Sequence, residues 1–485
     1  MYRRTLISIF LIFSSFIFMN GCDKTSRSTD YKLSRIHVNA IALDLQVGDK
    51  VRLTATAVPS VANEPTYQWA STDVDVVSAS NGVVEAKKEG KADIVVSTQN
   101  VKTVIPVTVT VPEYPGGSLL YNLKPCSLNR PAELLLNDAG SYATEGLDLT
   151  TCGKLAKLER FYALGERMIR YLVRPSGDAV VLFQSSLGDF SAYLNIPDKK
   201  ILIGTSPVIE TVVPFLQENR DYEVEIYHIY NLAKVRVIDA QTRESAEVSA
   251  TMDGSGGCGK GALQQGFSVG MQWDYYCFGL KEGTSALIKR LTVFSLKKKV
   301  KLLIYGDSIS QPEGYFPLKD FPLAWTQRII ARLGGDAMSS GRGGGTILTV
   351  LDYIKNELPF IEAKYVMVTV GTNGSNTEAN LTEVVNYIKS QGAIPILNNI
   401  PCNESGTQIE NNALIEKVRS KLGIKGCRFD LATSLAGDGE EVDKSMMFWE
   451  DYSGSYGWQI YHHPNGKGGQ MMFERTFIDI PEIYE

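Results

Sequence analysis

A serine that could act as a nucleophile follows a short apolar segment in the second half of the chain. Residues 300–305 (Val-Lys-Leu-Leu-Ile-Tyr) predict a strand, and Gly306, Asp307 and Ser308 follow it directly. A strand that ends in such a turn brings the hydroxyl to the rim of a sheet. Serine is a weak nucleophile alone, so it needs a neighbouring base and donors for the oxyanion that forms on attack at a carbonyl. We therefore predict that Ser308 is the nucleophile of an acyl transfer.

The base and the oxyanion donors must come from other parts of the chain. The chain has 4 histidines, and only His462 and His463 lie downstream of the strand, in a turn-rich segment near the C-terminus. A second predicted strand, residues 364–370, ends in Gly-Thr-Asn-Gly at 371–374, and a glycine-rich loop at 339–346 lies between the two strands. These segments could supply what Ser308 lacks.

Together, the four segments resemble the motif blocks of the SGNH or GDSL hydrolases, in the order of that family. The nucleophile, glycine, asparagine and histidine blocks correspond to Gly306-Asp307-Ser308, Gly341, Gly371-Thr372-Asn373 and His463-Pro464-Asn465. The resemblance covers residues 300 to 485 and implies a serine esterase that uses no cofactor. It implies that Ser308 and His463 catalyse, and that the N–H groups of Ser308 and Gly341 and the Asn373 amide form the oxyanion hole. The Pro-Asn context makes us prefer His463 as the base, with His462 as the alternative.

The acid that orients the histidine is not where the resemblance would put it. In the family it usually lies three residues before the histidine, where this chain has Ile460. Either a carboxylate comes from elsewhere, with Glu450 and Asp451 nearest, or a backbone carbonyl holds the ring of His463. We favour the backbone carbonyl, and hence a Ser-His dyad, because nothing in the sequence aims a carboxylate nine residues from Ile460 at this ring.

The elements that position these residues follow an α/β pattern. Helices are expected at residues 321–333, 347–358, 381–390 and 411–422, with a further buried strand at 393–397, so residues 299–485 predict an α/β domain with a parallel sheet. In a flavodoxin-like sheet of order 2-1-3-4-5, the first three strands are neighbours and ligands bind at their carboxyl ends. Ser308, Gly341 and Asn373 would then meet in one crevice.

Residues 33–112 predict a small β-sandwich, because short alternating strands are separated by turn residues. Segments 45–49, 68–71 and 81–84 resemble the bacterial immunoglobulin-like group 2 domain, which implies a spacer or adhesion module. Residues 113–298 begin with a Pro- and Gly-rich linker and are then mostly strand-like. They resemble laminin-G or concanavalin-like jelly rolls in pattern. Such sandwiches often bind sugars, and the aromatic residues able to stack on one are Trp273, Tyr275 and Tyr276, although aromatic residues in strands are more often core.

The N-terminus predicts export. A basic start is followed by an apolar run at residues 6–18 and then by Gly21 and Cys22, which is the pattern of a secretory signal at residues 1–21. The cysteine after Gly21 resembles a bacterial lipoprotein cleavage site, which implies an acylated Cys22 and a polar tether at residues 22–32. We therefore expect a protein anchored by lipid at the outer membrane or cell surface, with an ordinary secreted protein as the alternative.

Besides Cys22, six cysteines fall in sequence-local pairs, and an even number suits an oxidising compartment. We expect a disulfide for each pair, with buried free thiols as the alternative: Cys126–Cys152, Cys258–Cys277 and Cys402–Cys427. No pair has Cys-x-x-Cys spacing with a histidine nearby, so no metal site is predicted. The balance of 49 basic and 54 acidic residues, without a basic cluster, argues against a nucleic-acid partner.

The function favoured by these patterns is O-deacetylation of carbohydrate. A lipid anchor and two β-sandwich appendages suit an enzyme that acts on acylated carbohydrate at a cell surface. The alternative within enzymes is a lipase or lysophospholipase. The alternative outside enzymes is a glycan-binding surface protein whose hydrolase domain has decayed, and Ile460 is the best support for it.

Overall fold

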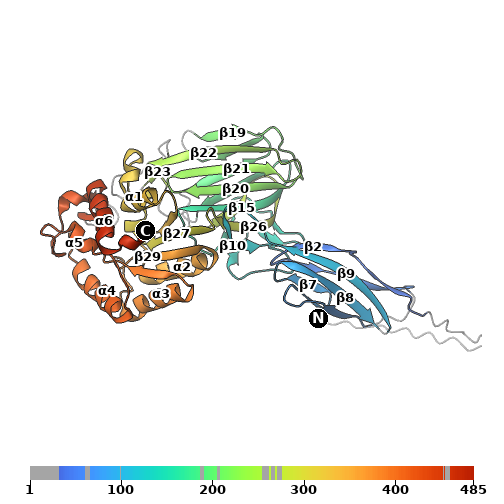
Figure 1. Ribbon diagram of the computed structural model, residues 1–485. Coiled ribbons are helices and arrows are strands. Elements are labelled where there is room, and N and C mark those ends of the chain that lie inside the picture. The colour runs from blue at the N-terminus through green and yellow to red at the C-terminus, as the bar shows by residue number, and fades with distance from the viewer. Residues whose placement is uncertain are drawn as a thin grey trace, which may run out of the picture.

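The computed structural model describes residues 32–485 except 61–65, 99, 186–189, 205–207, 254–260, 264–267, 270–275, 452 and 454–458. The expected signal segment, Cys22, Cys258, Trp273 and Tyr275 lie outside the described residues. The strands and helices form three units, and Figure 1 shows the middle unit between the N-terminal and C-terminal units. The expected sequence of two β-rich parts and an α/β part with a parallel sheet is therefore present. Within the described chain, no helix has both the length and the apolar character needed to cross a membrane.

The N-terminal unit is built from short strands whose buried and exposed residues alternate. They form three sheets, of order β2-β9-β8-β5, β3-β7-β6 and β1-β4. Alternate residues of β8, such as Ile94 and Val96, face a core that they share with Ile105 and Val107 of β9. The strands are β1 (Arg35–Val38), β2 (Leu43–Gln46), β3 (Lys50–Arg52), β4 (Ala55–Val58), β5 (Gln68–Ser71), β6 (Val77–Ser80), β7 (Val83–Ala86), β8 (Gly90–Thr98) and β9 (Val101–Thr110).

The middle unit is a sandwich of two antiparallel sheets. One sheet has the order β12-β13-β26-β15-β20-β21-β22-β23-β24, with β10 beside β26, and the other has the order β11-β14-β25-β16-β17-β18-β19. The strands are β10 (Ser118–Leu123), β11 (Leu134–Leu135), β12 (Gly140–Tyr142), β13 (Leu147–Leu149), β14 (Leu155–Leu158), β15 (Glu166–Pro175), β16 (Val180–Ser185), β17 (Ser191–Asn195), β18 (Lys200–Ile203), β19 (Ile209–Val212), β20 (Tyr222–Ile229), β21 (Leu232–Asp239), β22 (Ser245–Asp253), β23 (Gly261–Leu263), β24 (Ser268–Val269), β25 (Tyr276–Glu282) and β26 (Ala286–Ser295).

Tyr276, one of the aromatic residues expected to be able to stack on a sugar, is buried in this sandwich. Its hydroxyl accepts a hydrogen bond from Arg167 Nε at 3.2 Å. This burial agrees with the core role that aromatic residues in strands more often have.

The C-terminal unit is a parallel sheet with helices around it. The sheet has the order β28-β27-β29-β30, which is the expected order 2-1-3-4, and in the fifth position the described chain shows an isolated parallel bridge between Ile396 and Lys425. The strands are β27 (Lys299–Gly306), β28 (Ala337–Gly341), β29 (Glu362–Thr369) and β30 (Ile394–Leu397), followed by the antiparallel hairpin of β31 (Met447–Asp451) and β32 (Gln459–Pro464).

The first four helices of this unit lie close to where the sequence predicts them. The last two were not predicted, and the last of them begins within the segment expected to be rich in turns. The helices are α1 (Trp325–Arg332), α2 (Ile347–Glu357), α3 (Glu378–Ser390), α4 (Gln408–Leu422), α5 (Phe429–Thr433) and α6 (Gly466–Asp479), with 3-10 turns η1 (Ser308–Ser310), η2 (Pro312–Gly314), η3 (Leu318–Leu323), η4 (Leu358–Phe360), η5 (Lys444–Met446) and η6 (Pro481–Ile483). The first helix begins four residues later than expected, because the chain first forms η3 and the extended backbone of Ala324 (ψ 140°) separates η3 from α1.

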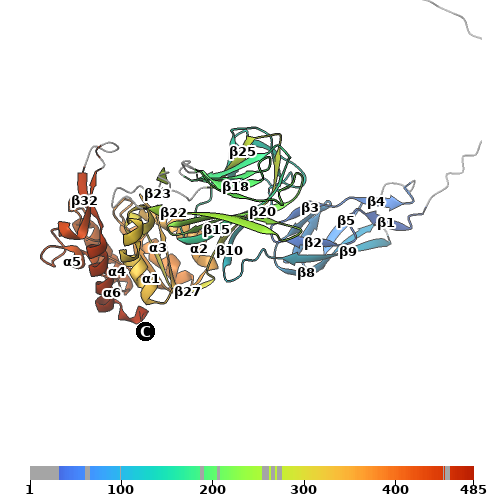
Figure 2. The ribbon, with the colours of Figure 1, turned by 90° about the horizontal axis from the view of Figure 1, so that it is seen from above.

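The middle and C-terminal units share one hydrophobic core. Buried side chains of the sandwich, such as Phe183 and Phe278, belong to the same packed cluster as Tyr305 and Tyr353 of the C-terminal unit. The N-terminal unit has a core of its own and is joined to the middle unit by Asp49, whose carboxylate accepts a hydrogen bond from Arg290 at 2.6 Å. Figure 2 shows the same succession of units from above.

The described cysteines are free thiols: Cys126, Cys152, Cys277, Cys402 and Cys427. The predicted disulfides Cys126–Cys152 and Cys402–Cys427 are therefore wrong, and the third pair includes Cys258, outside the described residues. Cys402 packs with Met446 and Met447, whereas Cys427 lies in a separate core cluster with Trp325. Burial raises the pKa of the Cys402 thiol to about 12, so this thiol stays protonated and unreactive.

Candidate active site

Three buried side chains form a hydrogen-bonded chain beyond the carboxyl end of β27. His463 Nε2 lies 2.7 Å from Ser308 Oγ, and His463 Nδ1 lies 2.6 Å from Glu450 Oε1. Ser308 is 6% exposed, His463 5% and Glu450 0%. A nucleophile, a base and an orienting carboxylate in this arrangement have the geometry of a serine-hydrolase triad.

A carboxylate therefore orients the ring, and the expectation of a backbone carbonyl and a dyad is wrong. Glu450 and Ile460 are directly paired across the β31–β32 hairpin, and paired residues of an antiparallel ladder project to the same face. The acid therefore lies on β31, opposite Ile460, and not at position 460 itself. Asp451, the other candidate, is exposed and accepts a hydrogen bond from Ser453 N at 2.9 Å.

Two glycines allow the turn that carries Ser308 to fold back over the strand ends. A Cβ at Gly306 would lie 2.2 Å from Ser310 Oγ, and one at Gly341 would lie 2.6 Å from the carbonyl carbon of Ser310. Asp307 caps η1 by accepting the N–H of Ile309 at 3.0 Å. Burial raises the pKa of Asp307 to about 7. These contacts fix the backbone on both sides of the serine.

His463 is held by the junction between β32 and α6. Asn465 is the N-cap of α6, and its side chain accepts the N–H groups of Lys467 and Gly468. Its amide nitrogen donates to the carbonyls of Ser445 and Met447, each at 3.0 Å. Asn465 therefore caps α6 and also ties the start of α6 to the start of β31. Because Asn465 lies two residues after His463, these contacts also hold the backbone next to the histidine.

The surroundings of His463 keep its ring neutral. Burial lowers the pKa of His463 well below its ordinary 6.5, so Nε2 can accept a proton from Ser308. The ring of Tyr315 lies against it, with centroids 4.1 Å apart and planes inclined by 34°. The ring of His462 contacts it edge-on at 4.5 Å, and among the described contacts only His463 brings a ring nitrogen to Ser308.

The residues expected in the oxyanion hole lie at the ends of neighbouring strands. Gly341 pairs with Gly306 at the ends of β28 and β27. Asn373 follows β29, and its Nδ2 donates to Gly345 O at 3.2 Å, with Asp307 Oδ2 at 3.5 Å. All of these segments meet at the carboxyl edge of the sheet, as parallel topology requires.

Gln311 also lies at this edge, and it belongs to none of the motifs recognised in the sequence. It is buried directly after η1, and its Oε1 accepts the N–H of Gly343 at 2.6 Å. This contact links the turn of Ser308 to the glycine-rich loop. In the sequence, the sign of this contact was a polar residue directly after the turn that carries Ser308.

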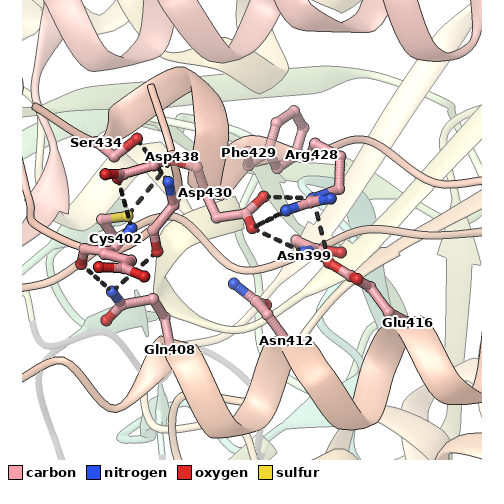
Figure 3. Close-up of polar contacts among 12 residues, drawn as sticks. Asn399, Cys402, Gln408, Asn412, Glu416, Arg428, Phe429, Asp430, Ser434 and Asp438 are labelled. Atoms are coloured by element: carbon pink, nitrogen blue, oxygen red, sulfur yellow. Dashed lines mark hydrogen bonds and ion pairs between the residues drawn. The ribbon is translucent and has the colours of Figure 1, made fainter. Parts of the chain in front are cut away.

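Figure 3 shows a polar network around the loop that follows β30. Asn399 Nδ2 donates to Glu416 Oε1 at 2.9 Å and to Asp430 Oδ2 at 3.0 Å, and Arg428 Nη2 donates to the same Asp430 oxygen at 2.9 Å. The network anchors the loop after β30. Farther along that loop, Glu404 exchanges two hydrogen bonds with the backbone of Tyr461, at 3.0 and 3.1 Å.

Within the described residues, no group of three or more His, Cys, Asp or Glu side chains is arranged to hold a metal ion.

Comparisons with known proteins give one family match and several distant structural likenesses. The N-terminal beta-sheet domain of hyaluronate lyase matches residues 60–109, within the segment that resembles an immunoglobulin-like domain. No curated protein matches the chain. The match covers a part of the N-terminal unit and says nothing of the triad.

The solved structures that resemble the chain each cover a part of it. A GDSL-like lipase from Bacteroides thetaiotaomicron is 14% identical over 37% of this chain and 85% of its own, with a TM-score of 0.28. A psychrotrophic esterase from Pseudoalteromonas sp. is 16% identical over 38% and 98%, also with a TM-score of 0.28. Domains 4 and 5 of the S-layer protein SbsC are 17% identical over 16% of this chain and 53% of their own, with a TM-score of 0.15. At these values, function has to be inferred from the side chains of the site.

Proposed function

We propose that the C-terminal unit is a serine esterase of the SGNH type. The observation that carries the proposal is the hydrogen-bonded chain from Glu450 through His463 to Ser308. A buried carboxylate on one ring nitrogen and a serine hydroxyl on the other serve general-base activation of that hydroxyl. The hypothesis of a decayed hydrolase domain was based on the missing acid at Ile460. Glu450 supplies that acid, so this argument for decay no longer holds.

Acylation follows from this geometry. The neutral His463 takes the proton of Ser308 as Oγ attacks the carbonyl carbon of the ester, and the carboxylate of Glu450 stabilises the imidazolium that forms. In our proposal the oxyanion accepts hydrogen bonds from the N–H groups of Ser308 and Gly341 and from the Asn373 amide. His463 then returns the proton to the leaving alcohol, and the acyl group remains on Ser308.

Deacylation repeats the steps with water. His463 removes a proton from a water molecule, whose oxygen attacks the acyl carbon, and then protonates Ser308 as it leaves. The carboxylic acid departs, and the triad returns to its first state without any cofactor.

The substrate that we propose is an O-acetylated carbohydrate at a cell surface. The low exposure of Ser308, 6%, favours a small acyl group over a long chain. The lipoprotein pattern at Cys22 and the two β-rich units ahead of the catalytic unit suit an enzyme anchored to a membrane and directed at glycans. We place it at the outer membrane or cell surface.

The test is hydrolysis of p-nitrophenyl esters of increasing chain length, followed by acetate release from acetylated glycans. We expect the acetate ester to be the best of the series and acetate to be released. Ser308→Ala should abolish both reactions, and a serine-directed phosphonate should label only the wild type. A preference for long chains would favour a lipase, and equal turnover by Ser308→Ala would exclude this serine as the nucleophile.

A further inference from the structure

The outer edge of the parallel sheet is covered by the middle unit. β28 is the edge strand, with β27 on its inner side. On its outer side, the N–H of Ser339 donates to the hydroxyl of Tyr230 at 3.1 Å, and the carbonyl of Ser339 accepts the N–H of Gly165 at 2.8 Å. Leu164 and Ser340 form an antiparallel bridge at the same place. The middle unit thus adds a short strand-like segment to the sheet of the C-terminal unit.

A buried carboxylate fixes that segment from a second direction. Oε1 of Glu357, at the end of α2, accepts the N–H groups of Ala163 at 2.6 Å and Leu164 at 3.2 Å. Its Oε2 accepts the hydroxyl of Ser340 at 2.8 Å, and Glu357 is 0% exposed. One side chain therefore binds the middle unit and β28 together.

The covered edge leads directly into the site. Arg342 N donates to Gly306 O at 3.2 Å, so the backbone N–H of Arg342 points toward β27. The backbone N–H and C=O groups of successive residues point alternately toward β27 and toward the outer edge. Ser339 and Gly341 are therefore both outward-facing, two residues apart on one edge. The first is held by Tyr230, and the second is the main-chain donor proposed for the oxyanion hole.

The segment that forms this contact has little freedom of its own. Tyr230 N donates to Gly165 O at 2.6 Å, and a Cβ at Gly165 would lie 2.1 Å from the Tyr230 ring. The tyrosine and the glycine thus form one unit that meets β28. A donor of an oxyanion hole stabilises the transition state only in the right place, and a misplacement of about 1 Å can cost about a hundredfold in rate.

We propose that Tyr230, with Leu164 and Gly165, is a positioning residue of the esterase: by completing the edge of β28, the middle unit holds the N–H of Gly341 at the oxyanion. This rests on the proposed function. Tyr230 acts through β28, so its loss should change turnover more than substrate affinity.

Tyr230→Phe is the direct test, because it removes the acceptor of the Ser339 N–H and keeps the ring. We expect kcat for p-nitrophenyl acetate to fall about ten- to a hundredfold, with KM within about twofold. Phosphonylation of Ser308 by a p-nitrophenyl phosphonate should slow by a similar factor, since the adduct uses the same oxyanion donors.

Tyr227→Phe is the matched control. It removes a buried hydroxyl from β20, where Tyr227 donates to Glu225 Oε2 at 2.6 Å, away from β28. We expect a comparable loss of Tm with unchanged kcat. Glu357→Gln keeps an acceptor for both N–H groups and should stay within about twofold of wild-type kcat, whereas Glu357→Leu should resemble Tyr230→Phe.

Wild-type kcat in Tyr230→Phe and Glu357→Leu, with Tm lowered as in the control, would overturn the positioning role. Equal turnover by Ser308→Ala would overturn the esterase itself. An inactive Ser308→Ala beside a fully active Tyr230→Phe would remove only the role of the middle unit, so the two failures are distinguishable.

Discussion

Glu450 and Ile460 are paired across the β31–β32 hairpin, so the acid of the triad reaches the ring of His463 from a neighbouring strand. Glu450 supplies a buried carboxylate, which the side chain of Ile460, three residues before the histidine, cannot supply. A hairpin that carries the acid on one strand and the base on the other must stay paired for the triad to exist. The proposed catalysis therefore requires that this pairing is kept.

Glu450→Gln should lower kcat by about three to four orders of magnitude, because the amide cannot stabilise the imidazolium, as in other triads that lose the acid. Asp451→Asn is the matched control, since this carboxylate is the next residue of β31, is exposed and bonds Ser453. It should stay within about tenfold of wild type. Steady-state kinetics on p-nitrophenyl acetate decide the matter, and an equal loss in both variants would contradict the assignment of Glu450.

His463→Ala should lose several orders of magnitude in kcat, and His462→Ala should lose much less, because only His463 lies at hydrogen-bonding distance from Ser308. Kinetics of the two purified variants, with matching circular dichroism spectra, check this ranking. The reverse order would transfer the role of base to His462.

The pH profile should show a base that remains neutral in mild acid. A histidine acts as a base only when it is deprotonated, so kcat/KM rises with pH through its pKa and is level above it. Burial lowers the pKa of His463, so the rise should lie below about pH 6.5, where an unperturbed histidine titrates. Measurement of kcat/KM with an ester of pH-independent spontaneous hydrolysis checks this, and a rise centred above that value would contradict it.

Stability should fall as pH rises from about 4.5 to about 7 because of Glu357. Burial raises the pKa of Glu357 from 4.5 to about 7, so the folded chain holds a proton that the unfolded chain releases. The contribution is present below pH 4.5 and is lost as pH rises to about 7, by on the order of 3 kcal/mol. Glu357→Gln removes this dependence. Its Tm relative to wild type should therefore be higher at alkaline than at acidic pH, and an equal difference at both would count against a protonated Glu357.

Cys22→Ser should move the protein from the membrane fraction to the soluble fraction of cells that express it, because the acylated thiol would be absent. Fractionation with detection of the protein measures the change. Mass spectrometry of the mature wild-type N-terminus is the independent check, and a chain without acyl groups would exclude the lipoprotein reading.

The parts of the structure that depend on local patterns were predictable from the sequence. The strand before Ser308, the first four helices of the C-terminal unit and the order of its sheet follow from apolar periodicity and from the rules of parallel topology. The choice of His463 as the partner of Ser308 followed from the small number of histidines and from the Pro-Asn context after it.

Contacts set by three-dimensional pairing were not predictable in this way. Glu450 has no fixed sequence offset from His463, since the length of the hairpin decides which residue lies opposite Ile460. Cys402 and Cys427 are close in sequence, yet they pack in different clusters. The edge contact at Ser339 is made largely by backbone groups, which every residue carries. No pattern of side chains in the sequence therefore predicts this contact.

The covered edge of β28 also bears on how the chain can be shortened. Leu164 and Gly165 precede β28 in the chain, so the surface that receives this strand is synthesised before the strand itself. A chain that began at Lys299 would leave unpaired N–H and C=O groups along β28, and free edges of this kind invite pairing with other chains. For this molecule, the smallest stable piece that contains the proposed triad is therefore larger than residues 299–485.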